Sequence, residues 1–188
     1  MAIKYLVQPP MGGRPSLFTL NRMYIPGPSR LPEILFLTTF PPRECGIATF
    51  AQDLTVAIAK KFDRTFALRV CPLESEDEIH AYGEGIAETL NTDVPVSYSR
   101  LAALINDDKA IKMVVIQHEF GLFAKMETAF LELMESLTKP IITVFHTVLP
   151  EPNPILKSMV KVIAERSAGI VVMTQASARI LSNDYGIL

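Results

Sequence analysis

The fold of this chain is decided by the stretch Leu35-Phe36-Leu37-Thr38-Thr39-Phe40-Pro41-Pro42-Arg43-Glu44-Cys45-Gly46-Ile47-Ala48-Thr49-Phe50. An apolar run stops at a Pro-Pro turn, and a short loop with a glycine then opens into a helical pattern. This order of strand, loop and helix N-terminus builds anion sites in α/β proteins, because the first N–H groups of a helix are unpaired and carry about +0.5 charge. The stretch therefore predicts an α/β fold with a binding loop at Cys45-Gly46.

Two further apolar runs repeat this layout, and each ends in a histidine: Val114-Val115-Ile116-Gln117-His118-Glu119 and Ile141-Ile142-Thr143-Val144-Phe145-His146. Continuous apolar runs are typical of strands that are buried on both faces of a parallel sheet. Their alternation with helical patterns predicts a Rossmann-like, doubly wound parallel sheet with helices on both faces. The expected strands are 34–39, 65–71, 112–117, 140–145 and 169–173, and the expected helices are 48–62, 97–107, 125–137, 154–166 and 175–184.

The segments outside this alternation are predicted to be irregular. Residues 1–32 contain six of the fourteen prolines, so we expect a Pro/Gly-rich arm before a single domain of residues 33–188. The acidic stretch from Glu74 to Glu78 is expected to be a solvated loop, and His80 a surface residue. In the helix over 48–62, the spacing of Phe50, Leu54, Ala57 and Ile58 predicts one apolar face.

The candidate binding residues all follow predicted strands. Ligands of doubly wound sheets bind beyond the carboxyl ends of the strands, where the Cys45-Gly46 loop, His118 and His146 converge. The glycine either lets a ligand approach the backbone or only serves the turn. An imidazole directly after an apolar strand is costly to bury unpaired, so His118, with Glu119 beside it, is the strongest candidate for a contact with a sugar hydroxyl or a phosphate. The alternative is a histidine satisfied by nearby backbone.

Composition and charge exclude several functions. A net charge of -2 gives no electrostatic footprint for nucleic acid and argues against more than peripheral association with membranes. No apolar run reaches the roughly 18–20 residues that span a bilayer, and no signal peptide is visible, so a cytoplasmic protein is predicted. The spacing of Cys45 and Cys71 fits no zinc or redox motif, and we expect no metal site.

Four segments resemble, in order, motifs of the bacterial glycosyltransferase family 4 proteins, whose two-domain fold is called GT-B. The resemblance covers the chain from about Glu33 to its end. The four segments are Phe40-Pro41-Pro42-Arg43-Glu44-Cys45-Gly46-Ile47-Ala48-Thr49-Phe50, Gln117-His118-Glu119-Phe120-Gly121-Leu122-Phe123, Thr143-Val144-Phe145-His146-Thr147 and Val171-Val172-Met173-Thr174-Gln175-Ala176-Ser177-Ala178.

The resemblance implies the acceptor-binding N-terminal half of a retaining, metal-independent enzyme that uses a nucleotide-sugar donor as a substrate and needs no cofactor. It implies a carbohydrate or glycolipid acceptor. It places His118 at the transferred sugar as the catalytic-site residue, and it implies that His146 helps to shape the acceptor side. The expected substrate-binding residues are Cys45, Gly46, Ile47, Thr49, Glu119, His146 and Thr147.

The family continues beyond a segment like Asp184-Tyr185-Gly186-Ile187 with a donor-binding domain, so we expect a truncated chain or a split gene product that is inactive alone. A cleft surface without its second domain would favour a homodimer of the fragment. Two alternatives remain open. The chain is a non-catalytic Rossmann-like binding or regulatory module, or it is half of another GT-B enzyme, such as a sugar-nucleotide epimerase or a glycan phosphorylase.

Overall fold

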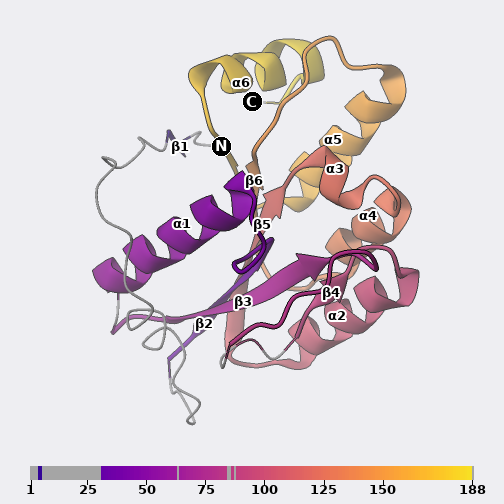
Figure 1. Cartoon of the computed structure of the whole chain (residues 1–188). Coiled ribbons are helices and arrows are strands. Elements are labelled where there is room, and N and C mark those ends of the chain that lie inside the picture. Colours follow the sequence, from indigo (N-terminus) through magenta and orange to yellow (C-terminus); the bar gives the residue numbers. More distant parts are fainter. Residues whose placement is uncertain (1–3, 6–30, 63, 84–85, 87, 188) are drawn as a thin grey trace.

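The computed structural model describes residues 4–5, 31–62, 64–83, 86 and 88–187. These residues form a seven-stranded sheet in the order β1-β7-β6-β5-β2-β3-β4, and every neighbouring pair is parallel (Figure 1). The strands are β1 (Lys4–Tyr5), β2 (Glu33–Thr38), β3 (Ala67–Glu74), β4 (Leu90–Asn91), β5 (Ile111–His118), β6 (Ile141–Phe145) and β7 (Gly169–Val172). The predicted fold class is confirmed.

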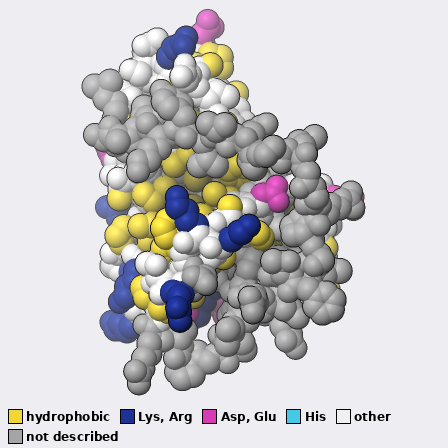
Figure 2. Space-filling model, turned by 90° about the vertical axis from the view of Figure 1, so that its left-hand side faces the viewer, with side chains coloured by type: hydrophobic (Ala, Val, Ile, Leu, Met, Phe, Trp, Pro, Cys, Tyr) yellow, Lys and Arg dark blue, Asp and Glu magenta, His cyan; other side chains and the backbone are white. Residues whose placement is uncertain are grey.

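Helices cover both faces of this sheet (Figure 1). The helices are α1 (Gly46–Phe62), α2 (Pro95–Asp107), α3 (Phe120–Phe123), α4 (Glu127–Ser136), α5 (Pro154–Arg166) and α6 (Gln175–Ile180), which runs into a π-helical turn (Leu181–Tyr185). On one face, α1 packs through Ala51 against Phe36 and Val115. The other face holds the larger core, with Tyr98 of α2 and Phe130 of α4. On the face of the molecule that is turned to the viewer in Figure 2, hydrophobic side chains are exposed between lysine and arginine side chains.

The strand order places a topological switch between β2 and β5. From β2 the chain continues to β3 and β4 on one side, and it then returns to β5 on the other side of β2. The register sets Leu37 beside Ile116, so the two strands end next to each other. In open α/β sheets, the crevice beyond such a switch is the usual place for a ligand.

The buried face of α1 differs from the predicted one. Ala48, Ala51 and Thr55 are fully buried, whereas Ala57 is exposed and Phe50 is only half-buried. The small residues face the sheet, which lets the helix backbone approach the strands closely. Leu54 and Ile58 pack against this core as predicted, and the prediction was wrong at Ala57, which lies on the open side of the helix.

Three further details depart from the sequence-based expectation. β4 was not predicted, because two residues are too few to form a periodic pattern. The helix expected over 125–137 is preceded by the separate short helix α3. Two residues of the expected irregular arm form β1, which pairs with β7. The prediction for residues 6–30 lies outside the described residues.

α5 begins and ends at its predicted residues because its start signal is local. The side chain of Asn153 accepts a hydrogen bond from the Leu156 N–H at 2.9 Å, and Pro154 occupies the first turn, where its missing N–H costs nothing. No helix among the described residues is long and apolar enough to cross a membrane.

Candidate functional site

The predicted binding loop forms the N-terminus of α1 at the switch. The Sγ atom of Cys45 lies 3.4 Å from the Ala48 N–H and 3.3 Å from Oγ1 of Thr39, so the cysteine caps the helix and ties it to the end of β2. Thr49 donates to the carbonyl oxygen of Cys45 from its N–H and from its hydroxyl. Cys45 is partly exposed, so this loop can be reached from solvent.

Gly46 is not required by packing. A Cβ atom at this position would meet no other atom within 4 Å, and the backbone has no positive φ here. Open space therefore lies beside the first turn of α1, next to the half-buried Ile47. Neither packing nor backbone conformation demands a glycine here, so the predicted role of Gly46 in binding stays a prediction.

His146 and Gln117 join β6 to β5 at the same edge. Nε2 of His146 lies 2.6 Å from Oε1 of Gln117, and the imidazole ring contacts the ring of Phe50 from α1 at a centroid distance of 5.2 Å. Burial lowers the pKa of His146, and the carboxylate of Glu119 opposes this shift. Gln117 is fully buried, and its Nε2 has no hydrogen-bond partner in the described part of the chain.

Glu119 and Thr147 form a second cross-strand pair. The Thr147 hydroxyl donates to Oε2 of Glu119 at 2.6 Å, while Oε1 accepts the N–H of Phe120 at 3.1 Å and caps α3. The backbone N–H of His146 also donates to the carbonyl oxygen of His118, which extends the pairing of the two strands. The segments after β5 and β6 are thus fixed to each other by three polar contacts.

His118 lies on the other face of the sheet from Gln117, because successive strand residues alternate. Its ring is 1% exposed and is surrounded by aromatic rings at centroid distances of 5.0–5.6 Å. These rings belong to Phe120, Phe123, Phe130 and Phe145. Burial lowers the pKa of His118 to about 3, and His146 adds to the shift, so the imidazole is neutral at physiological pH. Its predicted role at a transferred sugar stays a prediction, but a charged contact with a phosphate is excluded in this state.

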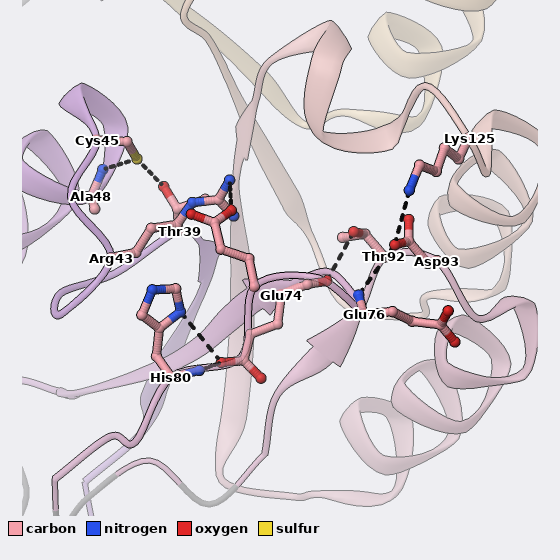
Figure 3. Close-up of polar contacts among 11 residues, drawn as sticks. Thr39, Arg43, Cys45, Ala48, Glu74, Glu76, His80, Thr92, Asp93 and Lys125 are labelled. Carbon is pink, nitrogen blue, oxygen red and sulfur yellow. Dashed lines mark hydrogen bonds and ion pairs between the residues drawn. The ribbon is translucent and has the colours of Figure 1, made fainter.

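A second polar group lies beside the Cys45 loop, on the side of β3. Arg43 reaches Oε2 of Glu78 at 2.6 Å, and Oε1 of Glu74 accepts the His80 N–H at 2.7 Å (Figure 3). Glu74 is buried with only 7% of its surface exposed, and His80 is half-buried. Glu76, Asp77 and Glu78 are exposed, as predicted for a solvated loop, but the prediction was wrong for Glu74, because β3 continues to that residue and the following segment folds back over it. His80, expected at the surface, is half-buried.

Sequence reasoning missed two participants of this edge, Gln117 and Arg43. The signal for Gln117 was present, since a lone polar residue in an apolar strand has to find a buried partner. Arg43 carried no such signal, because the chain segments that surround it are distant in sequence.

The described residues contain no group of three or more His, Cys, Asp or Glu side chains that could hold a metal ion. No known protein-family model matches this chain, and no curated protein sequence matches it.

Proposed function

We propose that this chain is the acceptor-binding half of a retaining glycosyltransferase that uses a nucleotide-sugar donor. One observation carries the proposal. The segments that resemble the first three family motifs meet at the switch, where Gln117 pairs with His146 and Glu119 pairs with Thr147, each at 2.6 Å. Three separate segments of the chain thus contribute polar side chains to one edge, as a ligand site requires.

The chemistry of these groups suits a sugar. Each hydroxyl of a sugar both donates and accepts hydrogen bonds, and this edge offers a carboxylate acceptor at Glu119 and a hydroxyl at Thr147, both half-buried. The Glu119 carboxylate already accepts from the Thr147 hydroxyl, which is the geometry that a sugar hydroxyl would use. In this proposal His118 is a neutral ring, because burial keeps its pKa at about 3, and its predicted contact with the sugar is made only when the ring is uncovered. The donor would be held by a second domain across the cleft.

Alkylation of Cys45 offers a direct test of ligand binding. Cys45 is partly exposed at the mouth of the crevice, whereas burial raises the pKa of Cys71 to about 12 and keeps it unreactive. The chain is treated with iodoacetamide alone and with glucose, mannose or N-acetylglucosamine, and labelling at each cysteine is followed by mass spectrometry. We expect at least one sugar to slow the labelling of Cys45, and the Glu119→Gln variant to lose this protection.

A matched control is Glu132→Gln, which changes a carboxylate on α4 away from the crevice and should keep the protection. If no sugar alters the labelling rate, or if both variants respond alike, the proposal of a sugar-binding edge is wrong.

A further inference from the structure

The polar residues beside the Cys45 loop form one group, which we call the Arg43 cluster: Arg43, Glu74, Glu78, His80 and Tyr82. Arg43 belongs to the loop between β2 and α1, Glu74 is the last residue of β3, and the others follow β3 in the chain. β2 and β3 are neighbours in the sheet, so the cluster lies at the same edge of the sheet as the proposed binding site. Figure 3 shows its labelled members Arg43, Glu74 and His80 on the same side as Cys45.

Charges and contacts confirm that these residues form a unit. Arg43 pairs with Glu78, and Glu74 accepts the N–H of His80. Burial raises the pKa of the Tyr82 phenol, the charge of Glu74 and the approach of its carboxylate to the phenol hydroxyl raise it further, and Arg43 lowers it. The hydroxyl thus lies close to Glu74 without meeting hydrogen-bond geometry. The Glu74 side chain is 9% exposed, whereas Glu78 at 46% forms the open rim.

The cluster contains polar atoms that are sealed from solvent and lack a protein partner. These atoms are Nε of Arg43, Nδ1 of His80 and Oη of Tyr82, judged against the described part of the chain. Nδ1 of His80 lies 3.8 Å from the nearest oxygen of Glu74, which is too far for a hydrogen bond. Each such atom lowers the free energy of unfolding by about 1–3 kcal/mol, so a purely structural cluster is not expected to contain three of them.

Most of these unpartnered atoms lie at the carboxyl edge of the sheet. Seven buried side-chain atoms of the described residues lack a partner, and three of them are in the Arg43 cluster. Two more belong to Gln117 and His118 at the carboxyl end of β5, on opposite faces of the sheet. The remaining two belong to Glu33 and Arg69, which face each other in an ion pair at 3.3 Å.

The balance of charge defines the class of ligand. Two carboxylates face one guanidinium, so the cluster is net negative and would repel a phosphate or a carboxylate. A neutral hydroxyl group suits it better, because it can accept from Nε of Arg43 and donate to a carboxylate at the same time. The phenol of Tyr82 and Nδ1 of His80 can each take part in the same way.

We infer that the Arg43 cluster is a second sugar position, which holds a neutral sugar unit of the acceptor next to the unit in the crevice. The inference rests on the proposed function and deepens it: the acceptor is an oligosaccharide or a glycan chain, and the cluster selects for its length. The ligand enters past the exposed Glu78 and reaches the buried carboxylate of Glu74.

The test compares mono- and trisaccharides of one sugar type on the ¹⁵N-labelled chain. The matched pairs are glucose with maltotriose, mannose with mannotriose, and N-acetylglucosamine with its β-1,4-linked trimer. Dissociation constants come from chemical-shift titrations of the wild-type chain and of Tyr82→Phe, Glu74→Gln and the control Tyr185→Phe. Glu74→Gln keeps the oxygen that accepts the His80 N–H, and Tyr185 lies outside the Arg43 cluster, where it donates to Leu149.

We expect the trisaccharide of one pair to bind about 10-fold more tightly than its monosaccharide, which is about 1.4 kcal/mol. Tyr82→Phe and Glu74→Gln should remove this gain and leave the monosaccharide affinity unchanged, while Tyr185→Phe keeps it. Equal affinities within every pair, or a gain that survives both cluster variants, would overturn the second position while the proposed function stands. If none of the six sugars binds, the proposed function fails and the inference fails with it.

Discussion

The imidazole of His146 and the amide of Gln117 meet at 2.6 Å across the ends of β6 and β5, in a place where Gln117 has no access to solvent. The amide oxygen is thereby satisfied, but Nε2 is not. Polar groups that are buried in this way hold a site in one geometry only while their partners remain.

The first prediction tests this dependence with a double-mutant cycle. His146→Phe leaves the buried amide of Gln117 without any partner and should lower the free energy of unfolding by about 1–3 kcal/mol. Gln117→Leu in the same chain removes the stranded amide and should restore most of that loss. Urea unfolding followed by circular dichroism gives the four values. Strictly additive effects of the two substitutions would show that the pair contributes no coupling.

The second prediction concerns acid and His118. The pKa of His118 is about 3 in the folded protein and near 6.5 in an unfolded chain, so the unfolded state binds the proton first as the pH falls. The stability is therefore fully present above about pH 6.5 and decreases between pH 6.5 and 3, by at most about 1.4 kcal/mol per pH unit.

The variant His118→Phe isolates this contribution, because it keeps an aromatic ring among the four phenylalanines and has no proton to bind. At neutral pH it should match the wild type within about 1 kcal/mol. At about pH 4.5 it should be more stable by about 2–3 kcal/mol. Urea unfolding at several pH values measures this difference. If the free energy of unfolding of the two proteins changes equally with pH, the pKa of His118 is not lowered in the folded state.

The third prediction compares two tyrosine hydroxyls. Oη of Tyr185 donates to the carbonyl oxygen of Leu149 at 2.8 Å, whereas Oη of Tyr82 is buried near the Glu74 carboxylate without meeting hydrogen-bond geometry among the described residues. Tyr185→Phe should therefore cost about 0.5–1.5 kcal/mol, and Tyr82→Phe should be neutral or stabilising. Thermal unfolding of both variants provides the measurement. A loss in Tyr82→Phe as large as that in Tyr185→Phe would show that its phenol has a partner in solution.

A feature of this molecule could be predicted from the sequence where its cause lies within a few neighbouring residues, and could not where it depends on contacts between distant segments. The strands and α5 follow from local patterns: continuous apolar runs, and a cap at Asn153 with a proline after it. The convergence of the Cys45 loop and His146 followed from the rule for parallel sheets. The buried Glu74 and its neighbours could not be predicted, because their surroundings come from β2, β3 and the segment after β3, whose contacts no local pattern encodes.

The packing of α1 shows the same limit and supplies the last prediction. Ala51 is fully buried against the sheet, while Ala57 on the same helix is exposed, although the sequence pattern favoured Ala57 for the buried face. Ala51→Leu inserts a large side chain where helix and strands are in close contact, and it should cost about 1–3 kcal/mol or more. Ala57→Leu makes the same chemical change on the open face and should stay within about 0.5 kcal/mol of the wild type. Because α1 also carries Cys45 at its N-terminus, Ala51→Leu should accelerate the alkylation of Cys45, and Ala57→Leu should not. Equal stabilities and equal labelling rates for the two variants would contradict the burial of Ala51 and the exposure of Ala57.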